Sequence, residues 1–256
     1  MSLPLQSLGD LPARKRGGPP LAVLTAYDFG SARLLDEAGV DLLLVGDSLG
    51  MVVHGLPDTT GVTMEMMLLH TRAVCRAQPR SPVIADLPYA SYDSPAQALA
   101  SAQSLMQAGA NAVKLEGGCR VLPQVQAIVA AGIPVCGHIG MLPQSIAEEG
   151  AYRRKGRTQD QAQALLEDAE ALDRAGVMAM VLESVVESVA AEITKRVSCC
   201  TIGIGSGPDN NGQVLVTHDV IGAFPWFRPP FAQARADCAA EIRRAAAAYI
   251  KSVREV

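Results

Sequence analysis

The sequence predicts an α/β protein built as one (β/α)₈ TIM barrel, and three observations lead to that prediction. Eight short apolar runs occur along the chain. Most are separated by longer segments with the apolar spacing of an amphipathic helix, and strands that alternate with helices form parallel sheets. Four similar phrases repeat one βα unit in which a helix ends at glycine and a strand follows: EAGVDLLLV, QAGANAVKL, AAGIPVCGH and RAGVMAMVL.

The eight predicted strands are three to five residues long. In chain order they are 21–25, 42–45, 83–85, 112–115, 135–137, 178–182, 201–204 and 214–217. The helices between them carry recognisable start and stop signals. One begins with Ser94 as N-cap and Pro95 at the first helical position, and it stops at Gly109. Further helices are expected at 31–39, from about residue 64, at 160–176 and at 233–254.

An open, doubly wound sheet is the alternative architecture. Such a sheet would be expected to carry a glycine-rich dinucleotide turn after its first strand. That position reads TAYDFGSA here, and the later GIGSG at 203–207 is followed by Pro208, which does not fit the G-x-G-x-x-G spacing. The closed barrel is therefore preferred, as a single domain over 1–256 with extensions at 1–20 and 223–256.

Composition narrows the function classes. The chain has 256 residues, a net charge of −4 and no basic cluster beyond 14–16 and 153–155, so no nucleic-acid partner is expected. No apolar run approaches the roughly 18 residues of a membrane span. The first twenty residues lack the apolar core of a signal peptide, and the six cysteines form no Cys-x-x-Cys pair. We therefore expect reduced thiols in a cytoplasmic protein.

Polar side chains end several predicted strands. Asp47-Ser48 follow the second strand, Asp86 the third, His138 the fifth and Glu183 the sixth, while Lys114 and Glu116 lie two apart on or beside the fourth. In a (β/α)₈ barrel, the carboxyl ends of the strands meet at one mouth, where active sites occur. The sequence thus predicts one shared site.

Three of these residues, Asp47, Asp86 and Glu116, come from neighbouring strands. Unpaired carboxylates that converge raise one another's pKa, and a cation would relieve the repulsion. An all-oxygen donor set favours Mg²⁺. The alternative is that each acid caps the helix that follows it. That reading suits a single acid better than three on consecutive strands.

The remaining strand-end residues fit roles around a metal-bound substrate. Lys114 could form a Schiff base, but beside a metal-binding acid it is better suited to grip a carboxylate or enolate oxygen. Glu183 lies across the mouth, where a general base belongs; its alternative is a helix N-terminal acid. His138 could be a core histidine bonded to backbone. The remaining histidines are expected to be structural: His54, His70 and His218.

Ordered motifs carry a family resemblance. They are LTAYD, LLLVGDSLGMVVHG, HTRAV, ADLPYASY, AGANAVKLEGG, PVCGHIGMLPQS, GRT, VLESV, IGIGSG and NGQVLVTHD. Together they resemble the ketopantoate hydroxymethyltransferase family over roughly 21–222, with a weaker match in the last helix. The resemblance implies a phosphoenolpyruvate-binding-like TIM barrel, Mg²⁺-dependent and typically a homodecamer. It also implies transfer of a one-carbon unit from 5,10-methylenetetrahydrofolate to α-ketoisovalerate, which gives ketopantoate in pantothenate (coenzyme A) biosynthesis.

Residue roles follow from the matched motifs. The resemblance implies metal binding by Asp47, Asp86 and Glu116, and binding of the keto acid by Asp47, Ser48, Asp86 and Lys114. Glu183 is the implied proton acceptor, and His138 lines the pocket. Chelation of the keto acid by Mg²⁺ would acidify its C3 proton, Glu183 would remove that proton, and the enolate carbon would attack the methylene group. Folate is implied by the resemblance alone.

Two alternatives and several departures accompany this interpretation. A Mg²⁺-dependent lyase or mutase of the phosphoenolpyruvate mutase/isocitrate lyase group would usually carry a KKCGH-type loop; the nearest segment here is PVCGHIG, on a strand. A non-enzymatic binding barrel would be expected to have lost some of the site residues, and all are present. The chain has Asn211 where the family usually has Asp, and it differs at 61–63, at 12–20 and in the link after residue 222.

Overall fold

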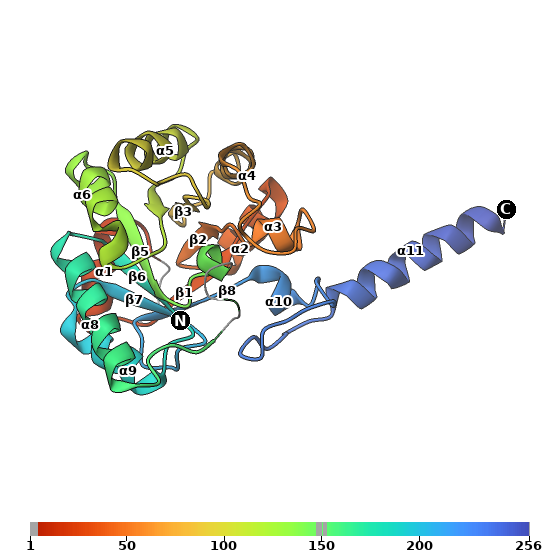
Figure 1. Ribbon diagram of the computed structural model, residues 1–256. Helices are drawn as coiled ribbons and strands as arrows, with labels where there is room; N and C mark the ends of the chain where they lie inside the picture. The colour runs from red at the N-terminus through yellow and green to blue at the C-terminus, as the bar shows by residue number, and fades with distance from the viewer. Residues whose placement is uncertain (1–4, 147–149, 151–152, 256) are drawn as a thin grey trace. The chain divides into compact units, whose positions relative to one another are not determined.

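The computed structural model describes residues 5–146, 150 and 153–255, and within them eight parallel strands close into a barrel in the order β1 to β8 (Figure 1). The first four residues of the expected N-terminal extension lie outside the described part. The strands are β1 Leu21–Thr25, β2 Leu42–Val45, β3 Val83–Asp86, β4 Ala112–Lys114, β5 Val135–Gly140, β6 Ala179–Glu183, β7 Cys200–Ile204 and β8 Gly212–Leu215. The predicted (β/α)₈ architecture is confirmed.

Strand boundaries differ from the predictions mainly at the carboxyl ends. β3, β5 and β6 continue through Asp86, Gly140 and Glu183, because polar residues there still pair with the neighbouring strand, as Asp86 does with Lys114. The eighth strand was predicted two residues too late. Gly212 pairs with Ile202 and Gln213 with Gly203, so the polar start of β8 concealed it in the sequence.

Helices lie between the strands along the chain, before the first strand and after the last. They are α1 Leu11–Lys15, α2 Phe29–Ala38, α3 Leu49–Val52, α4 Met64–Cys75, α5 Pro95–Gln107, α6 Leu122–Ala130, α8 Gln159–Arg174, α9 Glu187–Arg196, α10 Thr217–Ile221 and α11 Cys238–Arg254. The predicted cap of α5 is confirmed, since Ser94 Oγ accepts from Gln97 N–H at 3.2 Å. The last helix was predicted too long; it begins at Cys238, after Asp237 accepts from Ala240 N–H.

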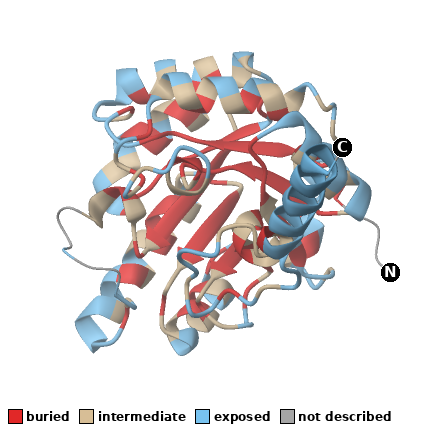
Figure 2. Cartoon of the chain, turned by 90° about the vertical axis from the view of Figure 1, so that its right-hand side faces the viewer, coloured by how far each residue is buried: buried red, intermediate tan, exposed pale blue. Residues whose placement is uncertain are grey.

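Two hydrophobic clusters follow from the alternation of side chains along each strand. Leu42 and Leu44 of β2 belong to the cluster inside the barrel, and Leu43 and Val45 belong to the cluster between the strands and the helices. Figure 2 shows the result: the strands are buried along nearly their whole length, whereas the surrounding helices bury only one side. Because successive strand residues face opposite sides, the register of each strand decides which residues reach the barrel interior.

The amino ends of the strands form what we call the barrel base. There Asp41, just before β2, accepts from the backbone N–H groups of Leu5 and Ala22 and forms a 2.9 Å ion pair with Arg14 of α1. Both side chains of that pair are about nine-tenths buried (9% exposed each). Leu5 and Leu11 join the interior cluster, so the N-terminal segment is anchored at this end of the barrel.

At other positions of the base, a side-chain oxygen likewise accepts hydrogen bonds from backbone N–H groups near the start of a strand. Asp36 accepts from Ser81 N–H, and Asp173 accepts from the N–H groups of Ser198 and Cys199. Asn211 Oδ1 accepts from the backbone N–H and the hydroxyl of Thr201 and from Lys15 Nζ. The departure at Asn211 therefore lies at the end of the barrel opposite the predicted site.

The backbone divides into two compact units, Met1–Val214 and Leu215–Val256. The first holds the barrel. The second holds α10 and α11, and within it Arg235 N–H donates to Val220 O and Ala239 N–H to Gly222 O. The single-domain organisation stays a prediction. Within the described part of the chain, no helix is long and apolar enough to cross a bilayer.

Candidate active site

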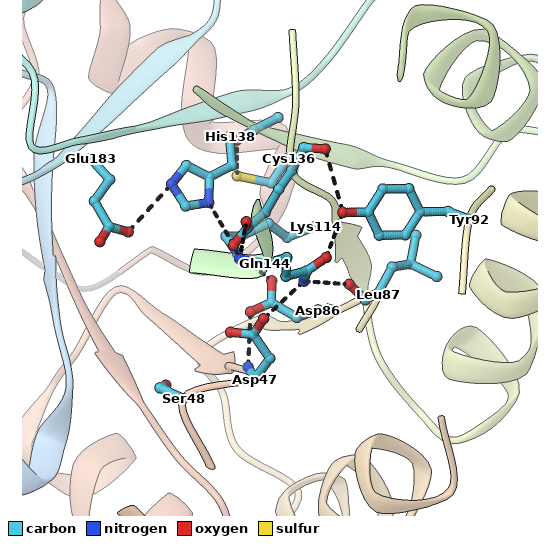
Figure 3. A network of polar contacts seen from close by, with 12 residues as sticks. Asp47, Ser48, Asp86, Leu87, Tyr92, Lys114, Cys136, His138, Gln144 and Glu183 are labelled. Atoms are coloured by element: carbon cyan, nitrogen blue, oxygen red, sulfur yellow. Dashed lines mark hydrogen bonds and ion pairs between the residues drawn. The ribbon is translucent and has the colours of Figure 1, made fainter. Parts of the chain in front are cut away.

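Strand alternation delivers most of the predicted site residues to the barrel interior. Inward-facing Ile84 of β3 is followed two residues later by Asp86, and inward-facing Ala179 and Val181 of β6 lead to Glu183. Residues an even number of positions apart on a strand face the same side, which we call strand parity. It likewise places Lys114 and Glu116 on the side of Ala112 of β4, and His138 on the side of Cys136 of β5. Asp86, Lys114, His138 and Glu183 meet at the carboxyl ends of the strands, which we call the mouth (Figure 3), and Glu116 Oε1 lies 4.0 Å from Lys114 Nζ there.

Asp47 reaches the mouth through a turn rather than through strand parity. Its backbone N–H donates to Asp86 Oδ2 at 3.0 Å, and the following Ser48 hydroxyl lies 2.9 Å from Tyr27 Oη. Gly46 leaves room for the Ser48 hydroxyl in this turn, since a Cβ there would lie only 2.9 Å from Ser48 Oγ and would displace it. The turn thus brings Asp47 beside Asp86, as Figure 3 shows.

Lys114 lies between two of the acids. Its Nζ is 2.6 Å from Asp86 Oδ1 and 4.0 Å from Glu116 Oε1, and all three side chains are almost completely buried. Burial alone would lower the pKa of Lys114, but Asp86, Glu116 and Asp47 together raise it above its ordinary value. The lysine is therefore a fixed cation at neutral pH, which does not suit a Schiff-base amine and agrees with a role in gripping anionic oxygens.

Asp47 is where the local charge is least balanced. Burial, and then repulsion from Asp86 and Glu116, raise the pKa of Asp47 well above its ordinary value, against the opposing effects of Lys114 and Gln144. Even with His138 protonated beside Lys114, two cations cannot neutralise the four carboxylates at the mouth. The mouth therefore holds surplus buried negative charge, a condition that a bound cation would relieve.

His138 joins the acid cluster to Glu183. Its Nδ1 lies 3.3 Å from Glu116 Oε1 and its Nε2 lies 3.3 Å from Glu183 Oε2, close enough for ion pairing although outside good hydrogen-bond geometry. Burial alone would lower the pKa of His138, but chiefly the Glu116 carboxylate raises it to about 9. His138 is thus no ordinary core histidine bonded to backbone.

Glu183 is the most accessible carboxylate of this group. Its side chain is 16% exposed, against 2% for Asp86 and Glu116, so it lies at the open side of the cluster. The next residue, Ser184, has a left-handed backbone conformation with φ of 49°, which is uncommon for a non-glycine residue and often marks a functional site. α9 begins only at Glu187, after Val186 as N-cap, so Glu183 is not a cap of that helix.

Two residues of this network, Gln144 and Tyr92, were missed by the sequence analysis. Gln144 Nε2 donates to Asp47 Oδ2 at 2.8 Å, its backbone N–H donates to Glu116 Oε2 at 3.0 Å, and Tyr92 Oη lies 2.5 Å from its Oε1. Both residues lie in loops, where no strand parity predicts direction. The only available signal was the LPQS segment shortly after β5.

The predicted metal residues were tested against the donor chemistry. Among the described residues, no three His, Cys, Asp or Glu side chains are grouped tightly enough to hold a metal ion as they stand. Asp47 and Asp86 nevertheless adjoin each other, and both carry oxygen donors suited to Mg²⁺. The surplus negative charge around Asp47 points the same way. The residues present therefore fit Mg²⁺, with Asp47 and Asp86 nearest to direct coordination and Glu116 beside them.

His54 and His70 contact each other rather than the acids, and Cys136, which lies beside the cluster, is a poor nucleophile. His54 Nε2 lies 2.9 Å from His70 Nε2, and His70 Nδ1 contacts Tyr27 O. All six cysteines are free of disulfide bonds in this structure. Burial raises the pKa of Cys136, the cysteine nearest His138 in the sequence, to about 12. A thiol held protonated to that extent is unsuited to nucleophilic catalysis.

Comparison with known proteins supports the resemblance seen in the motifs. The model of the Ketopantoate hydroxymethyltransferase family matches residues 6–256. A 3-methyl-2-oxobutanoate hydroxymethyltransferase from Pyrobaculum islandicum is 52% identical over 242 residues, which is 94% of this chain and 92% of that protein. The protein of the same name from Ignicoccus hospitalis is 49% identical over 249 residues, 97% of this chain and 94% of its own length.

Solved structures are similar in fold at low sequence identity. The phosphoenolpyruvate phosphomutase from Streptomyces platensis subsp. rosaceus superposes with a TM-score of 0.65 at 15% identity, over 97% of this chain and 88% of that one. A phosphonopyruvate hydrolase structure, a complex with oxalate and Mg²⁺, gives a TM-score of 0.63 at 15% identity, over 82% and 80% of the two chains. At this identity the likeness shows a shared barrel.

Proposed function

The chain belongs to the ketopantoate hydroxymethyltransferase family, and from this premise we propose how the mouth of its barrel carries out the reaction. Its activity is that of a 3-methyl-2-oxobutanoate hydroxymethyltransferase of pantothenate biosynthesis, which uses 5,10-methylenetetrahydrofolate. The observation that carries the assignment of the site is the burial of Asp47, Asp86 and Glu116 around a single lysine, with a more accessible Glu183 beyond them.

Asp47 and Asp86 would hold Mg²⁺, with Glu116 as the third acid of the site. Bound there, Mg²⁺ would supply Lewis-acid polarisation of the keto acid, which makes its C3 proton easier to remove. Lys114, as a fixed cation, would bind a carboxylate or keto oxygen of the substrate. Ser48 would offer a hydroxyl beside Asp47. No role in this proposal requires a residue from outside the mouth.

Glu183 would remove the C3 proton. A general base must reach the substrate and accept a proton at the operating pH. Exposure of Glu183 on the open side of the cluster supports the first requirement, and His138 at 3.3 Å supports a fixed orientation of its carboxylate. The carbon that loses the proton would then form a bond to the methylene carbon of 5,10-methylenetetrahydrofolate. Over the whole reaction both carbon–nitrogen bonds of that methylene group would break, water would supply the new hydroxyl group, and tetrahydrofolate would leave carrying the C3 proton and one proton of that water. Because His138 also contacts Glu116, it would hold the Glu183 carboxylate at a fixed position relative to the acid cluster.

Proton removal can be tested without the folate step. Wild-type protein with Mg²⁺ and 3-methyl-2-oxobutanoate in D₂O should exchange the C3 proton for deuterium, which NMR follows directly. Glu183→Gln should lower the exchange rate by about 10³-fold, within the range usual for a general base. The control is Glu192→Gln, which changes an exposed acid paired with Arg196 on α9. Exchange at the wild-type rate in Glu183→Gln would remove the base from this proposal.

The lyase or mutase alternative shares the barrel with this chain but only about 15% of the sequence. A direct assay separates the two readings. Turnover of 3-methyl-2-oxobutanoate that depends on methylenetetrahydrofolate supports the transferase. Turnover of isocitrate or phosphonopyruvate by the same preparation would restore the alternative.

We also propose a cytoplasmic homodecamer, as the family resemblance implies. Reduced thiols support a reducing compartment, and all six cysteines are free. Ile242, Tyr249 and Val253 lie at helical spacing on α11 and are each more than half exposed, which supports association with another subunit. Light scattering coupled to size-exclusion chromatography measures the assembly directly, and a monomer at micromolar concentration would contradict it.

A further inference from the structure

Gln144, which follows β5, connects its own segment with those after β2, β3 and β4, through its buried side-chain amide and its backbone N–H. It is 3% exposed and lies in a single 3-10 turn, Pro143–Ser145, after β5. Its Nε2 donates to Asp47 Oδ2 at 2.8 Å and to the carbonyl oxygen of Leu87 at 3.0 Å. Its backbone N–H donates to Glu116 Oε2 at 3.0 Å. Figure 3 shows the amide between Tyr92, Leu87 and Asp47.

Chemistry fixes which way the amide points. The Leu87 carbonyl can only accept, so the atom facing it must be the NH₂ group. The oxygen of the amide then faces Tyr92 Oη at 2.5 Å, and Tyr92 must donate. A phenol hydroxyl has a proton to donate, so Tyr92 suits this role. Reversing the amide would place its oxygen against the Leu87 carbonyl, which has no proton to donate.

Tyr92 is itself held in place. Its backbone carbonyl accepts from Gln124 Nε2 of α6 at 3.2 Å, and its hydroxyl also lies 3.4 Å from Glu116 O. Tyr92 belongs to the loop between β3 and α5, whereas Gln144 follows β5. The pair therefore fixes one loop against another at the point where the acids converge.

The consequence concerns which carboxylate atoms remain available. Asp47 Oδ2 is engaged by Gln144, and Glu116 Oε2 by the Gln144 backbone. No hydrogen bond to Asp47 Oδ1 occurs within the described residues, so this oxygen is the one left for a ligand. If the Asp47 side chain could rotate freely, either oxygen could face the ligand. Fixing the side chain on binding would then cost conformational entropy.

We propose that Gln144, oriented by Tyr92, is a positioning residue that presents Asp47 Oδ1 to the cation. This inference rests on the proposed function, since it assumes that Asp47 binds the metal. Residues that orient a metal ligand in this way typically change metal affinity by about 10–100-fold when they are replaced.

Binding of Mn²⁺ to the metal-free protein, followed by electron paramagnetic resonance without substrate, tests the proposal independently of turnover. Gln144→Met keeps the approximate shape of the side chain and removes all three hydrogen bonds of its amide, to Asp47, Leu87 and Tyr92; affinity should fall about 10-fold or more. Tyr92→Phe should weaken binding by about 3–10-fold, the value of one neutral hydrogen bond. Tyr89→Phe, which changes a half-exposed tyrosine of the same loop, is the control and should bind as the wild type does.

The double variant tests whether Tyr92 acts through Gln144. If it does, Gln144→Met/Tyr92→Phe should bind Mn²⁺ about as weakly as Gln144→Met alone, because interacting residues are not additive. Losses that simply multiply would overturn the link between the two residues. Thermal unfolding of each metal-free variant separates a lost fold from a lost orientation, and if Gln144→Met does not fold, Tyr92→Phe still decides.

Asp47→Asn separates failure of this inference from failure of the proposed function. If Asp47→Asn loses Mn²⁺ while Gln144→Met and Tyr92→Phe bind at wild-type affinity, the positioning role is wrong and the metal site stands. If Asp47→Asn itself binds Mn²⁺ at wild-type affinity, the metal site is wrong and the positioning role falls with it.

Discussion

Both ends of the barrel bury carboxylates, but they treat the charge differently. At the base, Asp41 has Arg14 and two backbone N–H groups as partners, and Asp173 has two backbone N–H groups and a hydroxyl. At the mouth, four carboxylates share Lys114 and a protonated His138, and Asp47 is left with a strongly raised pKa. Charge that is matched donor by donor stabilises a fold, whereas surplus charge is available to a ligand.

The pKa values follow the same division. Burial alone would raise the pKa of Asp173, but the N–H groups of Ser198 and Cys199 lower it overall. Burial would likewise raise the pKa of Asp36, and hydrogen bonds from Ser81 and Arg80 lower it. A carboxylate with a lowered pKa stabilises the folded state when ionised, and one with a raised pKa destabilises it. We expect substitutions at the two ends to separate activity from stability.

The largest effect should come from Asp47→Asn at the mouth. Loss of a metal ligand should lower kcat/KM by about 10⁴-fold, roughly 5 kcal/mol of transition-state stabilisation. The Tm in EDTA should stay the same or rise, because a buried carboxylate held near two others is removed. Calorimetry and steady-state kinetics on the same preparation measure both quantities. A large fall in Tm together with the loss of activity would contradict the distinction between the mouth and the base of the barrel.

Arg14→Met at the base should have the opposite profile. It leaves Asp41 buried without its cation, which should cost about 3–5 kcal/mol of unfolding free energy. The kcat of the folded fraction should be unchanged. Arg33→Met is the matched control: that arginine is exposed and pairs with Glu37 at 3.5 Å, so the change should cost less than about 1 kcal/mol. Equal costs in the two variants would show that the base pair is no more important than a surface pair.

Asp173→Asn should give a smaller, pH-dependent loss of about 1 kcal/mol at pH 7. Because the folded-state pKa of Asp173 is lowered, its stabilisation is present above the unfolded value of 3.8 and is lost as the pH falls through the folded value. The Tm gap between wild type and variant should therefore be widest near neutrality and close below about pH 4. Glu167→Gln on the same helix, an exposed position, should show no such closing gap. A gap independent of pH would contradict the assignment of charge to Asp173.

Asn211→Asp should have the smallest effect, a gain below about 1 kcal/mol. The bonds that Asn211 Oδ1 accepts from Thr201 and Lys15 would be kept, and the one to Lys15 would become charge-assisted. Burial lowers the pKa of Lys15, so an added carboxylate should also raise it. Thermal unfolding at pH 7 checks the gain. Altered kinetics for 3-methyl-2-oxobutanoate would contradict the placement of this position outside the mouth.

Strand parity explains how much of this could be predicted from the sequence. Asp86, Lys114, Glu116, His138 and Glu183 each follow an apolar strand residue by an even number of positions, so a barrel prediction places them on one surface. Asp47 was identified although its direction depends on a turn. Gln144 and Tyr92 were not, because their meeting depends on two loop conformations that leave no period in the sequence.

The contacts at the base of the barrel were harder to predict from the sequence than those at the mouth. Asp41 opens the same DLLLVGD run that Asp47 closes, and only the second acid was noticed. An acid just before a strand resembles any surface acid until its partners are known, and the partners of Asp41 come from segments 19 to 36 residues away. Hydrogen bonds that one side chain receives from distant segments therefore cannot be predicted from a local sequence pattern.

One short strand, β2, separates Asp41 from Asp47. At about 3.3 Å per residue, the interval is roughly 15–20 Å, beyond the screening length of about 8 Å at physiological ionic strength. Substitutions at the two acids should combine additively. Directed evolution toward a different keto acid could therefore randomise the mouth of the barrel while the stabilising contacts at the base stay the same. Variants without the desired activity would then still be recovered as folded protein.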